Sequence, residues 1–247
     1  MKNLKSETVK GVLFPLPPLA EQKQIVTKIE DIFTFIDTIE SNKTDLLTAI
    51  KHAKSKILDL AIHGKLVPQD PSDEPASVLL GRIRAEKKDK IAKGELKADK
   101  NDSYIYKNPA DNCHYEKMTD GKMKNIEEEI PFEVPEGWAW CRGNQIFLPM
   151  KSLLPYGETF KYIDIDSIDN KKMKIKSPKI IETVKAPSRA SRYTEFGDVL
   201  FAMVRPYLRN IAVVSESNCI ASTGFFVCKP NQALITNYLY ILMTSNY

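Results

Sequence analysis

Residues 25–39, IVTKIEDIFTFIDTI, and residues 46–60, LLTAIKHAKSKILDL, decide the fold of this 247-residue chain. Apolar residues recur through both stretches at alternating steps of four and three, which is the spacing of a coiled-coil seam. No proline or glycine interrupts residues 20–63. The predicted interface residues along the seam are Ile25, Ile29, Ile32, Ile36, Ile39, Leu46, Ile50, Ile57 and Leu60.

The seam predicts one long helix over residues 20–64, roughly 60 Å in length at 1.5 Å per residue. Gly64 stands where a left-handed helix cap is expected, and Pro68 follows where a helix does not continue. Lys43 occupies the one missing seam position, where a cation sets register or orientation. Such a stripe needs a second long helix to cover it. The alternative, a helix packed along a globular core, stays open.

Composition divides the rest of the chain into three further regions. Residues 1–19 end in a proline-rich apolar stretch that reads as the tail of a domain. Residues 65–130 are polar and lysine-rich, and predict one helix followed by a linker. From residue 131 to 247, short alternating apolar runs are separated by Gly, Pro, Ser and Asn, which indicates a strand-rich domain. The fold class expected is therefore α+β, with a long coiled-coil helix joined to a strand-rich domain.

Bulk properties limit the function classes. The net charge of +4 and the pI of about 8.7 permit an acidic partner such as DNA without requiring one. The four cysteines form no Cys-x-x-Cys pair and the three histidines are scattered, so we expect no metal site and no disulfide framework. No apolar run is long enough for a membrane helix, and the amino terminus lacks a secretory signal, so a cytoplasmic protein without membrane contact is expected.

Motifs for catalysis are missing from the sequence. Asn108-Pro109-Ala110 lacks the second proline and the aromatic residue of an adenine methyltransferase tetrad. Glu86 and Lys88 have the spacing of a nuclease pair, but they lie among other charges in a predicted helix. No phosphate-binding loop or nucleophile constellation is present. We therefore predict no catalytic residues.

Arginines cluster in two turn-like segments of the strand-rich region, residues 186–192 and 204–210. Arginine forks suit phosphates and guanine edges, and Ser, Thr, Asn and Tyr donate to phosphate. The alternative is that these arginines pair with carboxylates such as Glu195 and Asp198. The predicted DNA-contacting residues are Arg189, Arg192, Arg205, Tyr207, Arg209, Asn210 and Thr223.

Several segments, in order and spanning nearly the whole chain, resemble the specificity subunit of type I restriction-modification systems. Residues 14–22, FPLPPLAEQ, look like that family's junction between a target-recognition domain and its spacer helix. Residues 64–70 and 74–80 are similar to the stretch after the helix, and residues 130–140 to the opening of the next recognition domain. The match continues through the segments at 162–165, 186–192, 197–201, 204–210 and 221–225.

The resemblance implies that the chain reads double-stranded DNA and catalyses nothing. Modification subunits would bind the spacer and methylate adenine, and a restriction subunit would cleave. S-adenosylmethionine, ATP and Mg²⁺ would be bound by those partner subunits and none by this chain. The family has two recognition domains and two spacers, whereas this sequence has one spacer and a recognition domain that looks truncated at residue 247.

We therefore expect residues 1–19 to complete that domain, in this chain or in a neighbour. We also expect the spacer to pair with a second copy or with another half-subunit. The alternative function is a truncated or recombination-donor fragment that does not bind DNA and acts only as a coiled-coil dimerisation or assembly module.

Overall fold

A computed structural model describes residues 5–39, 44–99 and 102–245, without the side chains of residues 44–47. The chain divides into two units. Unit 1 holds residues 1–10 and 147–231, and unit 2 holds residues 11–146 and 232–247. Helices and sheets are both present, so the α+β class is confirmed. The boundaries at 146 and 231 differ from the predicted region 131–247, because the strand and the helix at its two ends pack with other elements of unit 2.

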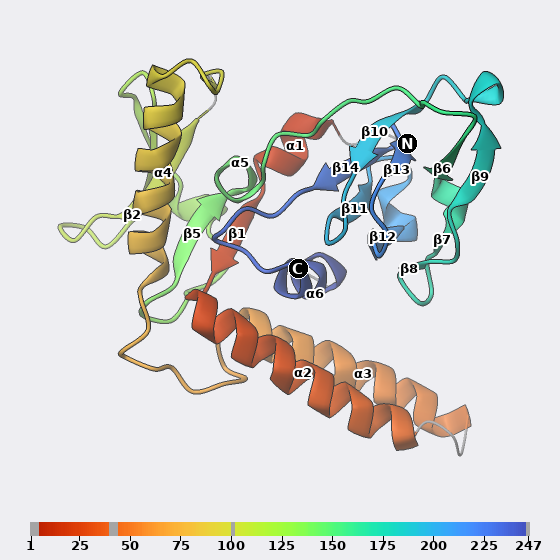
Figure 1. Cartoon of the computed structure of the whole chain (residues 1–247). Coiled ribbons are helices and arrows are strands. Elements are labelled where there is room, and N and C mark those ends of the chain that lie inside the picture. The colour runs from red at the N-terminus through yellow and green to blue at the C-terminus, as the bar shows by residue number, and fades with distance from the viewer. Residues whose placement is uncertain (1–4, 40–43, 100–101, 246–247) are drawn as a thin grey trace. The chain divides into compact units, whose positions relative to one another are not determined.

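The prediction of one helix over 20–64 is wrong. The structure has α2 (Leu19–Ile39) and α3 (Thr44–Ile62), which lie side by side (Figure 1). Lys54 of α3 forms an ion pair of 2.6 Å with Asp37 of α2, and 17 residues of continuous helix would separate those groups by roughly 25 Å. Folding back lets each apolar stripe cover part of the other within one chain. Lys43 lies outside the described residues.

The predicted seam is covered unevenly in this pair. Ile25, Ile29 and Ile50 are buried, whereas Ile39 is 41% exposed at the end of α2. Ile32, Ile36, Ile57 and Leu60 are partly buried, and the side chain of Leu46 lies outside the described part. The predicted cap is confirmed, because Gly64 has φ +66° and the Lys65 amide donates to the Leu60 carbonyl at 2.8 Å.

The first turn of α2 carries two buried polar side chains that fix the helix to the rest of unit 2. The Gln22 amide donates to the carbonyls of Pro17 (3.0 Å) and Ala233 (2.9 Å) and accepts from the Ile235 amide (3.1 Å). The neighbouring Glu21 accepts from Trp138 Nε1 at 2.7 Å. The junction motifs noted in the sequence therefore meet around one helix start.

The prediction of a linker within residues 65–130 is also wrong. Helix α4 (Ala76–Ala92) is followed by an antiparallel sheet of β2 (Ser103–Lys107), β3 (His114–Met118) and β4 (Met123–Asn125). Tyr104, Tyr106 and Tyr115 line one face of it. Most lysines of this region that the structure describes are exposed, whereas Ser103 of β2 and His114 and Glu116 of β3 are buried. A short 3-10 turn, Glu127–Glu129, follows β4.

The two ends of the sequence meet within unit 2. Strand β1 (Leu13–Leu16) pairs antiparallel with β5 (Ala139–Arg142), which runs into the short helix α5 (Gly143–Ile146). Helix α6 (Thr236–Thr244) packs beside α2, and the Tyr238 hydroxyl donates to the Pro15 carbonyl at 3.1 Å. The segment before α2 is thus closed by residues of its own chain.

Unit 1 is built from two main sheets. In strand order, the first contains β10 (Ala190–Thr194), β13 (Cys219–Ser222), β6 (Thr159–Ile163) and β9 (Lys179–Glu182), and the second contains β12 (Ile211–Val213), β11 (Val199–Ala202) and β14 (Phe225–Cys228). Unit 1 also contains a hairpin of β7 (Ile168–Asp169) and β8 (Lys174–Ile175), and helix α1 (Ser6–Lys10). Its 3-10 turns are Ile165–Ser167, Thr183–Lys185 and Pro206–Leu208.

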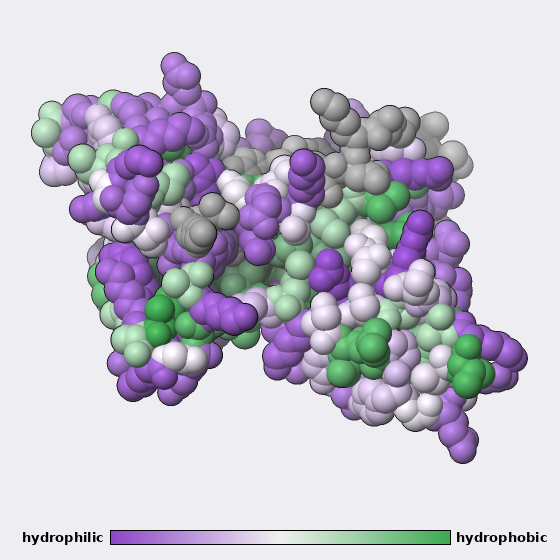
Figure 2. All heavy atoms as spheres, turned by 90° about the horizontal axis from the view of Figure 1, so that it is seen from above, coloured by the Kyte–Doolittle hydropathy of each residue, from purple (hydrophilic) through white to green (hydrophobic). Residues whose placement is uncertain are grey.

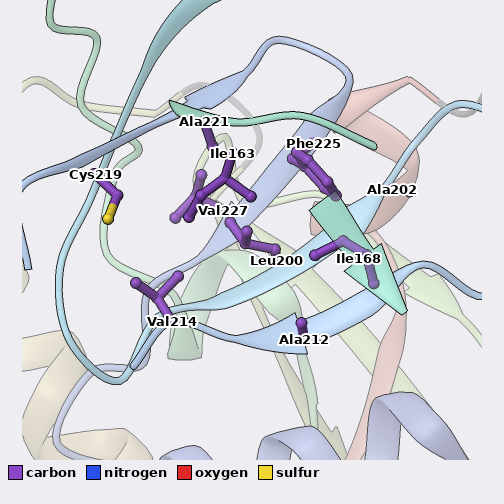
Figure 3. Close-up of a cluster of buried hydrophobic side chains, with 10 residues drawn as sticks. All are labelled: Ile163, Ile168, Leu200, Ala202, Ala212, Val214, Cys219, Ala221, Phe225 and Val227. Carbon is purple, nitrogen blue, oxygen red and sulfur yellow. The ribbon is translucent and has the colours of Figure 1, made fainter. Parts of the chain in front are cut away.

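Buried side chains from both sheets and the β7–β8 hairpin form one core in unit 1 (Figure 3). Ala221 and Phe225 of this core stand on either side of the turn between β13 and β14. Ala202, also buried there, is the last residue before the β11–β12 loop. The β11–β12 loop and the β13–β14 turn therefore begin and end on packed strands.

The surface drawn in Figure 2 is mainly hydrophilic, with hydrophobic side chains in small separate groups. None of the helices that the structure describes is long and apolar enough to cross a membrane. Within the same residues, no three His, Cys, Asp or Glu side chains lie together in a way that could hold a metal ion.

Candidate nucleic-acid interface

Backbone hydrogen bonds bring the predicted DNA-contacting segments together around the β13–β14 turn. The Thr223 amide donates to the Arg189 carbonyl at 2.8 Å, which ties the turn to the segment before β10. The Met203 amide donates to the Gly224 carbonyl at 2.9 Å, which ties the β11–β12 loop to the same turn. We call residues 186–192, 203–210 and 222–225 together the arginine edge. It combines three segments: 203–210 and 222–225 adjoin the core of Figure 3, and 186–192 contains Ala190 of a second buried cluster in unit 1.

The β11–β12 loop has an unusual backbone. Arg205 (φ 51°, ψ 57°) and Arg209 (φ 52°, ψ 45°) both adopt the left-handed conformation, on either side of the 3-10 turn Pro206–Leu208. The Leu208 amide donates to the Arg205 carbonyl at 2.9 Å. Each left-handed arginine costs about 1 kcal/mol or more, and such strain persists where the surroundings fix it. Strained non-glycine residues are concentrated at functional sites.

Three arginines of the edge, Arg189, Arg192 and Arg205, can be assessed for pairing with carboxylates. Arg189 and Arg205 are exposed and Arg192 is partly buried. None of these three forms an ion pair within the described residues. Arg192 Nε is buried and has no hydrogen-bond partner in that part of the chain.

The carboxylates proposed as alternative partners, Glu195 and Asp198, are instead bound by Lys229. Its Nζ lies 2.5 Å from Glu195 Oε2 and 3.2 Å from Asp198 Oδ2. Burial alone would lower the pKa of Lys229, but the bonds and charges of these two carboxylates outweigh it and raise the pKa. The hydrogen bond from Lys229 also lowers the pKa of Glu195. Glu195 and Asp198 are therefore bound by a lysine and do not pair with Arg189, Arg192 or Arg205.

The other predicted contact residues differ in accessibility. Tyr207 is 57% exposed between the two left-handed arginines. Thr223 and Arg209 are partly buried. The prediction for Asn210 is not supported, because this residue is only 5% exposed and its carbonyl accepts from the Ala202 amide at the base of the loop. Asn210 closes the loop and does not present its side chain outward.

Sequence reasoning missed the backbone contacts that assemble the edge and the buried polar junction at the start of α2. A signal for the junction was present, because Glu21 and Gln22 stand next to prolines where an apolar helix begins. Such polar residues at an otherwise apolar junction are expected to bond to backbone groups. Nothing local in the sequence indicated that the Met203 amide would reach the Gly224 carbonyl.

Comparison with known proteins identifies relatives of the chain. No family model matches it. It is 32% identical over 213 residues to the type I restriction enzyme EcoAI specificity subunit of Escherichia coli, a match that covers 82% of this chain and 32% of that protein. The chain is a homologue of type I restriction specificity subunits. The EcoEI specificity subunit of the same organism is 30% identical over 212 residues, with the same coverage of both chains.

The chain spans about a third of the length of these specificity subunits. Among solved structures, the HsdS subunit from Thermoanaerobacter tengcongensis is similar, with 40% identity and a TM-score of 0.44 over 46% of this chain and 30% of that one. The two specificity subunits of Escherichia coli confirm the resemblance stated from the sequence motifs.

Proposed function

We propose that this chain is a DNA-recognition subunit of a type I restriction-modification complex in the cytoplasm, and that the arginine edge of unit 1 contacts double-stranded DNA. The observation that carries the proposal is the assembly of Arg189, Arg192 and Arg205 at one edge without intramolecular carboxylate partners among the described residues. Arginines without a carboxylate partner suit phosphate oxygens and guanine edges. The relationship to specificity subunits supports the same role.

The chain would catalyse nothing itself. A modification subunit would supply adenine methylation with S-adenosylmethionine, and a restriction subunit would supply cleavage with ATP and Mg²⁺. The α2–α3 pair is the surface we propose for assembly, either with the modification subunit or with a second copy of this chain. Exposed apolar side chains near the end of α2, Phe35 and Ile39, support this.

Fluorescence anisotropy on a labelled duplex of random sequence tests the proposal, with and without the modification subunit. The triple variant Arg189→Ala, Arg192→Ala, Arg205→Ala should weaken binding strongly. The slope of log K against log salt concentration should become shallower by roughly 1 for each arginine–phosphate interaction that the variant removes. A charge-matched control replaces three exposed lysines of the β7–β8 hairpin: Lys171, Lys172 and Lys174.

The outcomes separate the two candidate functions. Wild-type binding that is abolished in the arginine variant and kept in the lysine control supports DNA recognition. Equal weakening in both variants indicates general charge attraction and contradicts a specific edge. No binding in either setting, with or without the modification subunit, favours a fragment that acts only in assembly.

A further inference from the structure

The β11–β12 loop differs from the rest of the arginine edge in how firmly its backbone holds Arg205. Pro206 fixes its own φ, and the Leu208 and Arg209 amides each donate at 2.9 Å, to the carbonyls of Arg205 and Pro206 respectively. The loop is also tied at its base, where the Ala202 amide donates to the Asn210 carbonyl at 3.1 Å. The Cα of Arg205 is therefore held in one position and one backbone orientation.

Arg189 is held in a different way. It follows Pro187 and Ser188 in an exposed segment before β10, and the bond from the Thr223 amide to its carbonyl ties it to the β13–β14 turn. Its side chain is exposed and its backbone is not in the left-handed region. Attraction to a phosphate needs only a nearby charge, whereas a bidentate contact with a base edge needs a fixed fork.

We propose that two arginines of the edge have different roles: Arg205 contacts a guanine base, and Arg189 binds the DNA backbone. This inference rests on the proposed function. The left-handed backbone at Arg205 points to it, because strain that costs about 1 kcal/mol is kept at a position where a smaller or more flexible residue would fit better. A guanidinium matches O6 and N7 of guanine in the major groove. Tyr207, two residues further along the same loop, is also exposed.

Charge-conserving variants separate the two roles. Arg205→Lys keeps the positive charge but loses the fork, so a base contact suffers and a phosphate contact does not. Arg189→Lys is the matched control at the other arginine. Arg205→Gly suits the left-handed backbone, so it removes the side chain without adding strain.

The experiment is selection of bound sequences from a randomised duplex library, using the full chain together with its modification subunit. Wild type should enrich a motif that contains a guanine. Arg205→Lys and Arg205→Gly should each reduce the preference for that guanine by roughly 10- to 100-fold, and thermal melting should remain as in wild type. Arg189→Lys should leave the motif unchanged, and Arg189→Ala should weaken binding to every sequence alike.

Two results overturn the inference in distinguishable ways. If wild type enriches a motif and Arg205→Gly enriches the same motif with the same preference, Arg205 does not read a base, and the proposed function survives. If wild type enriches no motif at all, the proposed function fails and the inference fails with it.

Discussion

Replacing Gln22 by leucine tests how the ends of the sequence are joined in unit 2. Gln22 is completely buried, and its amide group satisfies the carbonyls of Pro17 and Ala233 and the amide of Ile235. Leucine has a similar size but can neither donate nor accept a hydrogen bond. The substitution therefore removes three bonds that connect the start of α2 to the residues before it and before α6.

The magnitude follows from the number of groups affected. Each buried backbone group that loses its partner costs about 1–3 kcal/mol, and partial relaxation keeps the sum near the lower end. We expect a loss of about 3–5 kcal/mol in the free energy of unfolding of unit 2. With a urea slope of about 2 kcal/mol per molar, the unfolding midpoint should fall by about 2 M.

The assay is urea unfolding followed by tryptophan fluorescence. Both tryptophans, Trp138 and Trp140, belong to unit 2, so this signal reports that unit without interference from unit 1. Gln24→Leu is the matched control, because Gln24 lies on the same helix and is exposed. It should change the free energy by no more than about 0.5 kcal/mol.

A midpoint for Gln22→Leu within error of the Gln24→Leu midpoint would refute this reasoning. Such a result would mean that the Gln22 amide does not hold these backbone groups together in solution.

Further predictions concern burial and backbone conformation. Arg142→Met removes the partner of the buried Glu116 carboxylate and should lower the free energy of unfolding by about 3–5 kcal/mol. Adding Glu116→Gln should recover part of that loss, and urea unfolding measures both variants. Gly64→Ala should cost about 2 kcal/mol or more, read from thermal melting, because a Cβ there would lie 2.2 Å from Pro135 Cγ in a left-handed backbone. A thiol reagent near pH 8 should label Cys113 first in the native protein, because the other three cysteines are buried. Faster labelling at any of those three would contradict their burial. Burial raises the pKa of these protected thiols, Cys141, Cys219 and Cys228.

The apolar seam shows what periodicity can and cannot predict. Spacing identified which face of residues 25–60 is apolar, and Ile25, Ile29 and Ile50 are buried as expected. Spacing does not determine whether that face meets a second molecule or a second helix of the same chain. Residues 40–43 are Glu, Ser, Asn and Lys, so the apolar stripe is interrupted where the sequence passes from α2 to α3. Pairing within one chain needs no second molecule, and that advantage cannot be read from spacing.

The composition of residues 103–125 did not indicate the small sheet that they form. The region is polar and lysine is its commonest residue type, yet Tyr106 pairs with Tyr115 and Ile105 with Glu116 in a regular antiparallel register. Glu116 is buried because Arg142, far along the sequence, supplies two hydrogen bonds to it. From sequence alone, Glu116 is expected at the surface, because the arginine that pairs with it comes from another strand.

The candidate site was predicted as a set of residues but not as an arrangement. Arg189 and Arg205 were identified by residue type and turn-like surroundings. Their meeting at one edge depends on the bonds from the Thr223 and Met203 amides, which link segments from different strands. Asn210 illustrates the limit, because residue type alone did not indicate that this position is buried at the base of the loop.

The most direct test of the central claim is methylome sequencing of cells that express this chain together with its modification subunit. We expect adenine methylation at one defined motif, and loss of that motif when Arg189, Arg192 and Arg205 are all replaced by alanine. Methylation that is absent with the wild-type chain, or unchanged with the triple variant, would contradict a sequence-reading role for the arginine edge.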